Sequence, residues 1–282
     1  MRSVLRDSYR QILANLPPAL STRMQFFVNV GHWPNISEPR TFNEKVLKRK
    51  LTENDGRFAL CADKVRVKHY VMERLGPQFI IPTLWDGKAL PAAMPDDWPE
   101  RVVVKANHAS GWNAFVSRGD DIAWAQARRH SARWLSKPWA KHVHERWYNR
   151  IERRILVEPF IGEAADAPAD YKLFVFDGKV QMIQVDTDRF SGHKRDLFSP
   201  AFEHLQATLL YPNNPVRPKA PKHLEAMLSA ASVLGQGFDF VRIDFYDLPS
   251  GPIFGEMTFA PDAGNGRFVP RTLDEKLGQF WG

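Results

Sequence analysis

The chain contains 282 residues with a formal net charge of +7, and 44% of the residues are hydrophobic and 25% charged, as in a globular protein with ample material for a core. No apolar run approaches the ~20 residues that a membrane span needs, and the N-terminal "MRSVLRDSYRQILANLPPAL" lacks the continuous apolar core of a signal peptide. One cysteine, Cys61, excludes an internal disulfide framework and fits a reducing compartment, so we expect a cytoplasmic protein without a transmembrane segment.

The positive charge predicts attraction to anions without naming them. A phosphorylated or carboxylated small molecule, or an acidic polysaccharide, fits this charge as well as a nucleic acid does. Basic residues are spread along the chain and no single tract dominates. We therefore expect no nucleic-acid partner.

The first hundred residues have the pattern of a mostly helical region. "FNEKVLKRKL" (residues 42–51) and "ADKVRVKHYVMERLG" (residues 62–76) have helical spacing, and the second has Asp63 near its start and Gly76 as a stop. "FIIPTLWDG" then predicts a short strand and a turn. The proline-rich "LPAAMPDDWPE" (residues 90–100) is the expected boundary between lobes.

Strands and hairpins dominate the remainder. "RVVVKANHASGWNAFVSRGDD" predicts two strands joined by a small-residue loop, followed by one or two helices interrupted at Pro138. "RRILVEPFI" predicts a strand, and "DYKLFVFDGKVQMIQVD" a hairpin with a tight turn at Asp177-Gly178. Residues 221–235 form a helix that leads into a last hairpin, "RIDFYDLPSGPIFGEMTF". The mixture predicts α+β lobes with antiparallel sheets.

The last hairpin brings two carboxylates face to face. If it folds symmetrically, positions that sum to 500 are opposite each other, so Asp244 faces Glu256 and Arg242 faces Thr258. Two opposed carboxylates are tolerated where a cation bridges them, and oxygen ligands favour Mg²⁺ or Mn²⁺. Arg242 would then bind an anion beside the metal. The alternative is a solvated sheet face with a cross-strand Arg–Glu pair.

Two further segments have features of a nucleotide site. Lys105 ends a β-branched strand before the small-residue loop, whose backbone N–H groups can approach phosphate oxygens, although the P-loop pattern is missing. In "ILVEPFIGE", Glu158 could hold an adenine amino group, with the backbone of Phe160 and Ile161 completing the contacts. An ordinary hairpin turn and an acidic edge strand are the respective alternatives.

These motifs occur in a particular order over roughly residues 40–280: Asp63-Lys64, "VVVKANHASGWN", "ILVEPFI", "DYKLFVFDGK", "VRIDFY" and "FGEMTFAPDAG". The order resembles the ATP-grasp superfamily, and most closely the TupA-like group associated with teichuronopeptide and polysaccharide biosynthesis. The resemblance implies an ATP-grasp fold, with two α+β lobes of antiparallel sheets clamping ATP. The implied regions are a helical N-terminal region (1–100), a small lobe with a mobile phosphate loop (101–163) and a large lobe with the metal site (164–282).

The resemblance also implies a role for each matching residue. The expected ATP contacts fall into four groups: two phosphate-binding lysines, the loop that closes over the triphosphate, the adenine site, and a triplet facing the nucleotide. The lysines are Lys64 and Lys105, and the loop contributes Asn107, His108, Ser110 and Gly111. The adenine site consists of Glu158, Phe160 and Ile161. The triplet contributes Asp170 and Lys172, and Lys172 is also placed among the catalytic residues. Glu163 or Asp166 would take the ribose hydroxyls, and the choice between them stays open.

The metal and reaction centre follow from the same resemblance. Asp244 and Glu256 resemble magnesium ligands, and Arg242 the residue that steadies the reacting anion. Many ATP-grasp enzymes have Asn two residues after the second acid as a further metal ligand, whereas this chain has Thr258. A hydroxyl binds a metal less firmly, and Asn265 is a possible substitute.

The implied activity is that of an ATP-dependent carboxylate–amine ligase that forms an acyl phosphate. The implied substrates are ATP with Mg²⁺ or Mn²⁺, a uronic-acid carboxylate of a surface polysaccharide or its precursor, and an amino acid as the amine. In "DTDRFSGHKRD" we expect Arg189 and Lys194 to face phosphate or the acidic substrate, with a solvated basic loop as the alternative.

Two other functions remain open at this point. Asp186-Thr187-Asp188 is an Asp-x-Asp triplet that could bind a metal and a nucleotide sugar in a glycosyltransferase. A non-catalytic polyanion-binding protein could keep the same fold, although retention of both acids, both lysines and Arg242 argues against it.

Overall fold

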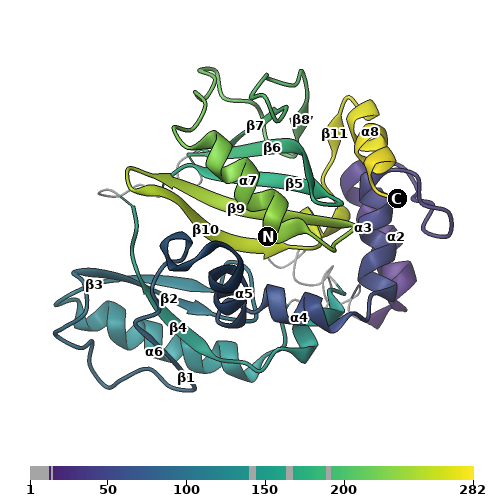
Figure 1. The fold of residues 1–282 in the computed structure, drawn as a ribbon. Helices are drawn as coiled ribbons and strands as arrows, with labels where there is room; N and C mark the ends of the chain where they lie inside the picture. The colour runs from purple at the N-terminus through teal and green to yellow at the C-terminus, as the bar shows by residue number, and fades with distance from the viewer. Residues whose placement is uncertain (1–12, 14, 140–143, 163–167, 189–191) are drawn as a thin grey trace.

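A computed structural model describes residue 13 and residues 15–139, 144–162, 168–188 and 192–282. The described chain forms two antiparallel sheets with helices packed around them, and the N-terminal helices lie beside both (Figure 1). These N-terminal helices are α2 (Pro18–Val30), α3 (Phe42–Thr52), α4 (Gly56–Ala62) and α5 (Arg66–Leu75). No helix of the described residues is long and apolar enough to cross a membrane.

The helix ends follow local side-chain chemistry. A capping box starts α3: the Thr41 hydroxyl accepts from the Glu44 N–H, and the Glu44 carboxylate accepts from the Thr41 N–H. The helix expected over residues 62–76 begins later, at Arg66. Its predicted start was wrong because the Asp63 carboxylate accepts the N–H of Val65 at 2.9 Å, which stabilises a turn between α4 and α5.

The first sheet contains four strands. Their order is β1 (Trp85–Gly87), β4 (Ile155–Pro159), β2 (Arg101–Ala106) and β3 (Asn113–Ser117). Helix α6 (Asp121–Ser136) packs against it through the buried Trp124 and ends before Pro138, as expected. The strand expected in "FIIPTLWDG" is shorter than predicted and consists of β1 alone. Residues Pro77–Phe79, just before it, form a 3-10 turn, η1. A second 3-10 turn, η3 (Arg146–Arg150), precedes β4.

The second sheet contains five strands. Their order is β10 (Gly251–Thr258), β9 (Phe240–Leu248), β5 (Asp170–Phe176), β6 (Lys179–Thr187) and β7 (Lys194–Phe198). Asp177 and Gly178 join β5 to β6 with φ angles of 46° and 72°, as the Asp-Gly turn predicts. Helix α7 (Leu224–Gly235) crosses one face of this sheet. The remaining elements are a small sheet of β8 (Thr208–Leu209) and β11 (Phe268–Val269), the 3-10 turn η4 (Pro261–Gly264) and α8 (Thr272–Phe280).

Both faces of the second sheet are covered, but one of them only in part. On one face Val175 meets α7 at Gly235. On the other face Phe174 and Phe240 pack against Phe42 of α3, with ring centroids 5.6 and 4.8 Å away. Since alternate residues of a strand share a face, the polar side chains of Lys172 and Asp244 continue this second face beyond the helix.

The hairpin of β9 and β10 has two registers. Asp244 lies opposite Glu256 and Arg242 opposite Thr258, as predicted. Nearer the turn, Phe245 lies opposite Phe254 and Leu248 opposite Gly251, so the symmetric register was wrong there. A β-bulge at Gly255 accounts for the difference, because it inserts one residue into β10.

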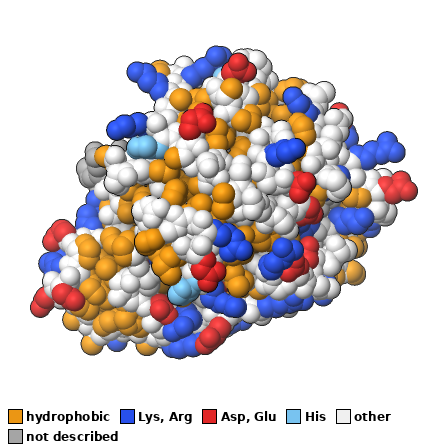
Figure 2. Space-filling view, in the orientation of Figure 1, with side chains coloured by type: hydrophobic (Ala, Val, Ile, Leu, Met, Phe, Trp, Pro, Cys, Tyr) orange, Lys and Arg blue, Asp and Glu red, His pale blue; other side chains and the backbone are white. Residues whose placement is uncertain are grey.

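The hydrophobic core is divided between the sheets. The larger cluster surrounds the second sheet and includes Phe42, Phe174 and Phe240, and a separate cluster lies under the first sheet around Val104 and Trp124. Basic side chains are scattered over the face seen in Figure 2, with acidic ones among them, and form no single stripe there. A third, small cluster of Phe26, Ile36 and Leu47 lies among the N-terminal helices. The two large clusters agree with two lobes, while the boundaries at residues 100 and 163 stay a prediction.

Candidate active site

A cavity of about 320 Å³ lies between the two sheets. Its walls come from both sheets, from the turn before α5 and from the loop between β2 and β3. Most of the residues predicted to bind ATP or metal line it: Lys64, Lys105, Ser110, Gly111, Glu158, Phe160, Ile161, Asp170, Lys172, Asp244 and Glu256. The structure thus brings together side chains that are up to 192 positions apart in the sequence.

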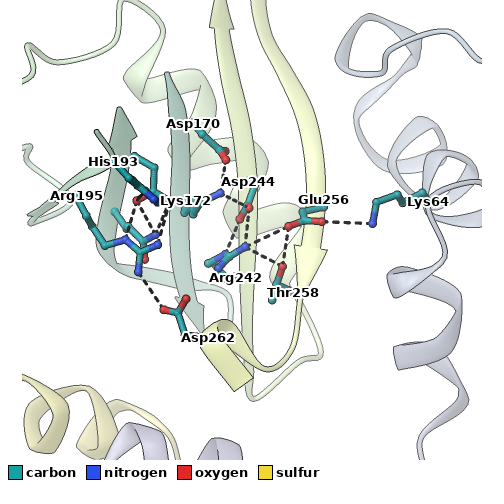
Figure 3. Close-up of polar contacts among 12 residues, drawn as sticks. Lys64, Asp170, Lys172, His193, Arg195, Arg242, Asp244, Glu256, Thr258 and Asp262 are labelled. Atoms are coloured by element: carbon teal, nitrogen blue, oxygen red, sulfur yellow. Dashed lines mark hydrogen bonds and ion pairs between the residues drawn. The ribbon is translucent and has the colours of Figure 1, made fainter. Parts of the chain in front are cut away.

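Lys64 connects three walls of the cavity. Its Nζ donates a hydrogen bond to the carbonyl of Ala109 in the β2–β3 loop at 2.9 Å and lies 3.6 Å from Glu256 Oε2 (Figure 3). Burial raises the pKa of the Glu256 carboxyl group. The nearby cations, Lys64 foremost, lower it by more, so that the pKa of Glu256 is about 2. The ammonium group therefore sits beside an ionised acid, where an anionic ligand would meet it.

Glu158 is held between two lysines. Lys105 Nζ on β2 and Lys68 Nζ on α5 both pair with its carboxylate, which is buried with its side chain 5% exposed. Lys68 also donates to the carbonyl of Ile81 and to Thr83 Oγ1, both at 2.7 Å. Burial raises the pKa of Glu158 and the charges of Lys105 and Lys68 lower it, with a net decrease. Glu158 therefore orients the lysines, besides any contact it makes with adenine.

The wall beyond Glu158 is apolar. The ring of Phe160 contacts Phe115 edge to face at 5.7 Å, and the guanidinium of Arg101 lies 4.1 Å from its centroid. The N–H of Phe160 donates to the Arg101 carbonyl at 3.0 Å, and Phe160 and Ile161 both line this end of the cavity. A flat, partly apolar ligand such as a purine base fits such a wall.

The two opposed acids are joined by Arg242. Its Nε and Nη2 donate to the two oxygens of Asp244, both at 2.7 Å, and Nη2 also reaches Glu256 Oε1 at 3.3 Å and Thr258 Oγ1 at 3.0 Å. Burial lowers the pKa of the Arg242 guanidinium, but the charge of Asp244 raises it by more, so the pKa increases overall. The planar guanidinium thus holds Asp244 at two points and orients both acids.

Lys172 lies next to Asp244 in the same row of the sheet. It is opposite Asp244 on β9, donates to Asp244 Oδ2 at 2.8 Å and also pairs with Asp170. Its side chain is 7% exposed. Burial lowers the pKa of Lys172, and the charges of Asp170 and Asp244 raise it by more. Asp170 and Lys172 therefore face the cavity with both charges paired, whereas Tyr171 between them packs in the core on the other face of the sheet.

The donor atoms at the acid pair fit a hard divalent cation. Asp244, Glu256 and Thr258 offer oxygen atoms only, and Glu256 Oε2 points toward Lys64 and the cavity. Within the residues that the structure describes, no group of three His, Cys, Asp or Glu side chains is gathered as a complete metal site. A cation here would therefore complete its coordination with phosphate oxygens, as Mg²⁺ commonly does.

The phosphate loop differs from its prediction at two residues. Ser110 and Gly111 line the cavity, and Gly111 has a left-handed φ of 72° that favours glycine. Asn107 and His108 are buried instead, 0% and 1% exposed. The Asn107 amide donates to Asp63 Oδ1 at 3.0 Å, and His108 Nε2 lies 3.2 Å from the carbonyl of Trp134. They support the loop from behind and do not reach the cavity.

Other predicted residues lie away from the cavity or outside the described residues. Lys194 is on β7 opposite Thr187 and does not line the cavity, and strand alternation directs it to the other face from Arg195. Glu163, Asp166 and Arg189 lie outside the described residues, and their roles stay predictions.

Sequence reasoning did not identify several residues near the site. Lys68 and Tyr246 line the cavity, and the i,i+4 spacing of Lys64 and Lys68 was the available signal. Glu145 interacts electrostatically with Glu256 and Arg242. Burial raises the pKa of Glu145 to about 7, although the charge of Lys50 lowers it. Nothing in the local pattern around Glu145 indicates this proximity.

The Asp-x-Asp triplet is not arranged as a metal site. Both oxygens of Asp186 accept from Arg195, at 2.7 and 3.2 Å, and Asp186 is 3% exposed, whereas Asp188 is exposed. Burial raises the pKa of Asp186, but the hydrogen bonds and charge of Arg195 lower it by more, to about 2. The two acids of the triplet therefore lie in different environments, one buried beside a guanidinium and one exposed, whereas Asp244 and Glu256 face each other across one strand pair.

Comparison with known proteins identifies a family over most of the chain. A family model described as TupA-like ATPgrasp matches residues 44–281. No curated protein matches the chain.

Three solved structures are among those to which the chain is similar. D-alanine–D-alanine ligase from Bacillus anthracis complexed with ATP is 14% identical, with 79% of this chain and 63% of that one covered and a TM-score of 0.46. D-cycloserine synthetase DcsG is 19% identical (79% and 69% covered, TM-score 0.43), and ATP-grasp ligase PsnB complexed with minimal precursor is 10% identical (72% and 53% covered, TM-score 0.39). The chain spans less than two thirds of the length of the first of these structures.

Proposed function

This chain belongs to the TupA-like ATP-grasp family, and on that premise we propose that it is an ATP-dependent ligase that joins a carboxylate to an amine. The observation that supports this most directly is the convergence of Lys64, Lys105, Asp244 and Glu256 on one cavity. Two lysines and two acids at opposite walls suit a triphosphate with its divalent cation.

The proposed binding mode follows the walls of the cavity. The adenine lies against Phe160 and the backbone of Ile161, and the phosphates reach Lys105, Lys64 and the backbone of Ser110 and Gly111. Asp244 and Glu256, with Thr258 beside them, would hold Mg²⁺ or Mn²⁺. When bound, this ion supplies neutralisation of phosphate charge. Glu163 or Asp166 remains the proposed ribose contact.

The proposed reaction has two steps that are balanced in atoms and charge. A carboxylate oxygen of the acceptor attacks the γ-phosphorus of ATP, and the bond between that phosphorus and the β–γ bridging oxygen breaks, which releases ADP and forms an acyl phosphate. An amine nitrogen then attacks the carbonyl carbon, phosphate leaves, and the nitrogen loses a proton. Lys64 and Arg242 stabilise the negative charge of the first step, and Lys172 keeps Asp244 oriented.

The proposed acceptor is a uronic acid of a surface polysaccharide or its precursor, and the amine an amino acid. The net charge of +7 supports an anionic acceptor. We further propose a cytoplasmic location, supported by the single cysteine. The proposed regions are residues 1–100, 101–163 and 164–282, the last two clamping ATP.

The proposal is tested by ADP release from ATP and Mg²⁺ in the presence of D-glucuronic acid and each standard amino acid. We expect at least one pair to stimulate ADP release, and Glu256→Gln to abolish that stimulation. Asp247→Asn is the matched control, since this ion-paired acid lies on the same strand as Asp244 and does not line the cavity. Binding of ATP without stimulation by any pair would contradict the ligase and favour a binding role. Hydrolysis of a UDP-sugar would favour the glycosyltransferase.

A further inference from the structure

Cationic side chains of the protein itself lie against every oxygen atom of the acid pair. Both oxygens of Asp244 accept from Arg242 at 2.7 Å, and Oδ2 also accepts from Lys172 at 2.8 Å. Arg242 also reaches Glu256 Oε1, at 3.3 Å. The remaining oxygen, Glu256 Oε2, faces the ammonium group of Lys64 at 3.6 Å (Figure 3). A divalent cation at the acid pair therefore has to share these oxygens with the side chains.

The contact with Lys64 is the one that a ligand displaces most easily. Arg242 and Lys172 are 8% and 7% exposed, lie on the same sheet as the acids and bind at hydrogen-bond distance. Lys64 lies in the turn before α5, its side chain is 20% exposed, and its distance of 3.6 Å from Glu256 exceeds that of a good hydrogen bond. Its position can therefore change without disturbing the sheet.

Lys64 also contacts the loop that is proposed to bind phosphate. Its Nζ donates to the carbonyl of Ala109 at 2.9 Å, and the next two residues, Ser110 and Gly111, line the cavity. An ammonium group has three N–H donors, so it can bind further acceptors on this side. Lys64 thus lies between the carboxylate of Glu256 and the expected position of the phosphates.

The ammonium group and a divalent cation compete for Glu256 Oε2. Two positive charges a few ångströms apart repel strongly at a partly buried site. Among the nearby cations, Lys64 lowers the pKa of Glu256 the most, so it already supplies much of the positive charge that this acid needs. Phosphates change the balance, because they attract the ammonium group and also supply oxygen ligands to Mg²⁺.

We propose that Lys64 determines the order of binding: its ammonium group keeps free divalent cations away from Glu256, and the phosphates of ATP draw it aside, so that the cation binds together with the nucleotide. This inference rests on the proposed function, because it takes the cavity as the site of ATP and its cation. It makes Lys64 a specificity-determining residue, which selects the metal–nucleotide complex over the free metal ion.

The test measures two affinities separately, without acceptor or amine. Binding of Mn²⁺ alone is followed by the decrease of the electron paramagnetic resonance signal of free Mn²⁺, and binding of ATP alone, in EDTA, by isothermal titration. We expect Lys64→Met to lower the Kd for Mn²⁺ at least fivefold, because a competing cation is removed. It should raise the Kd for ATP at least fivefold, because a phosphate contact is lost. General damage to the site would instead weaken both.

Four further variants make the result specific to the charge beside Glu256. Lys64→Gln should repeat the effects of Lys64→Met, whereas Lys64→Arg keeps the charge and should leave the Kd for Mn²⁺ within twofold of the parent. Glu256→Gln added to Lys64→Met should abolish the gain in Mn²⁺ affinity. Lys105→Met is the matched control, since this cavity lysine pairs with Glu158, and it should weaken ATP binding with less than a twofold gain for Mn²⁺.

The outcomes separate this inference from the proposed function. An unchanged or weaker affinity for Mn²⁺ in both Lys64→Met and Lys64→Gln would overturn the binding order, and the ATP site would remain in place. An equal gain for Mn²⁺ in Lys105→Met would also overturn it, because the effect would then come from the overall charge of the cavity. If the parent binds ATP neither with nor without Mn²⁺, the proposed function itself is wrong, and the binding order falls with it.

Discussion

Glu256 lies directly opposite Asp244 because the chain bulges at Gly255. The two-residue turn at Pro249 and Ser250 pairs Leu248 with Gly251, and this register without a bulge would place Gly255 opposite Asp244. A slip of one residue turns a side chain to the other face of the sheet. The bulge therefore decides that Glu256 faces the cavity and not the core.

Substitution of Gly255 should displace Glu256. A Cβ at this position would lie 3.2 Å from the carbonyl oxygen of Asp244 and 3.4 Å from the Tyr246 ring, closer than most such contacts. We expect Gly255→Ala to cost about 1–2 kcal/mol of stability and to reduce ATP turnover at least fivefold. Gly56→Ala, where nothing lies within 4 Å of the added carbon, should change neither quantity. Full activity of Gly255→Ala would show that the bulge does not position the acid.

Replacing Arg242 by lysine should remove the orientation of both acids while keeping the charge. A single ammonium group cannot reproduce the paired contacts to Asp244 at 2.7 Å together with that to Thr258. We expect Arg242→Lys to lower turnover at least 100-fold with a smaller loss of ATP affinity, measured by steady-state kinetics and calorimetry. Arg57→Lys is the control, because that arginine pairs with Asp55 at an exposed site. Equal turnover of Arg242→Lys and the parent would contradict the assigned role.

Loss of Lys68 should weaken ATP binding. The substitution Lys68→Met removes one of the two partners of Glu158 and one positive charge from the cavity wall. We expect the Kd for ATP, measured by isothermal titration, to rise about fivefold to tenfold, which is about 1–1.4 kcal/mol and lies within the net contribution of a typical hydrogen bond, about 0.5–1.5 kcal/mol. Lys88→Met removes a lysine from an exposed pair with Glu152 and should leave the Kd unchanged. An equal effect of the two substitutions would argue against a specific role of Lys68.

Acid should destabilise the packing of the phosphate loop through His108. Burial lowers the pKa of His108 to about 4 from an ordinary value of 6.5, so the folded state disfavours the charged ring. The stability that the neutral ring contributes is complete above pH 6.5 and is lost as the pH falls toward 4, by up to about 3 kcal/mol.

This prediction is checked by urea unfolding at pH 7 and pH 4.5, followed by tryptophan fluorescence, to which Trp112, with its ring centroid 5.7 Å from that of His108, contributes. His108→Gln should reduce the difference in unfolding free energy between the two pH values, whereas His69→Gln, at an exposed position, should not. An identical pH dependence in both variants would contradict the assignment.

Much of the fold and part of the site could be predicted from local pattern. Period-two alternation places Arg242 with Asp244 on one strand and Glu256 with Thr258 on the next, and the Asp177-Gly178 turn closes its hairpin, because both depend on residues adjacent in sequence. That the two pairs share a face depends on the bulge at Gly255, which the sequence did not indicate. The order of the motifs was sufficient to indicate the family, which the match over residues 44–281 confirms.

Tertiary structure alone decided which side chains meet. It paired Glu158 with Lys68 as well as Lys105, paired Arg195 with Asp262, and buried His108 behind the loop. Each outcome depends on contacts between distant segments and on burial, which change the partners and the pKa of a charged group without leaving a trace in its sequence neighbours. Alternation along a strand is a local property, whereas the position of a charge inside a cavity depends on the whole fold.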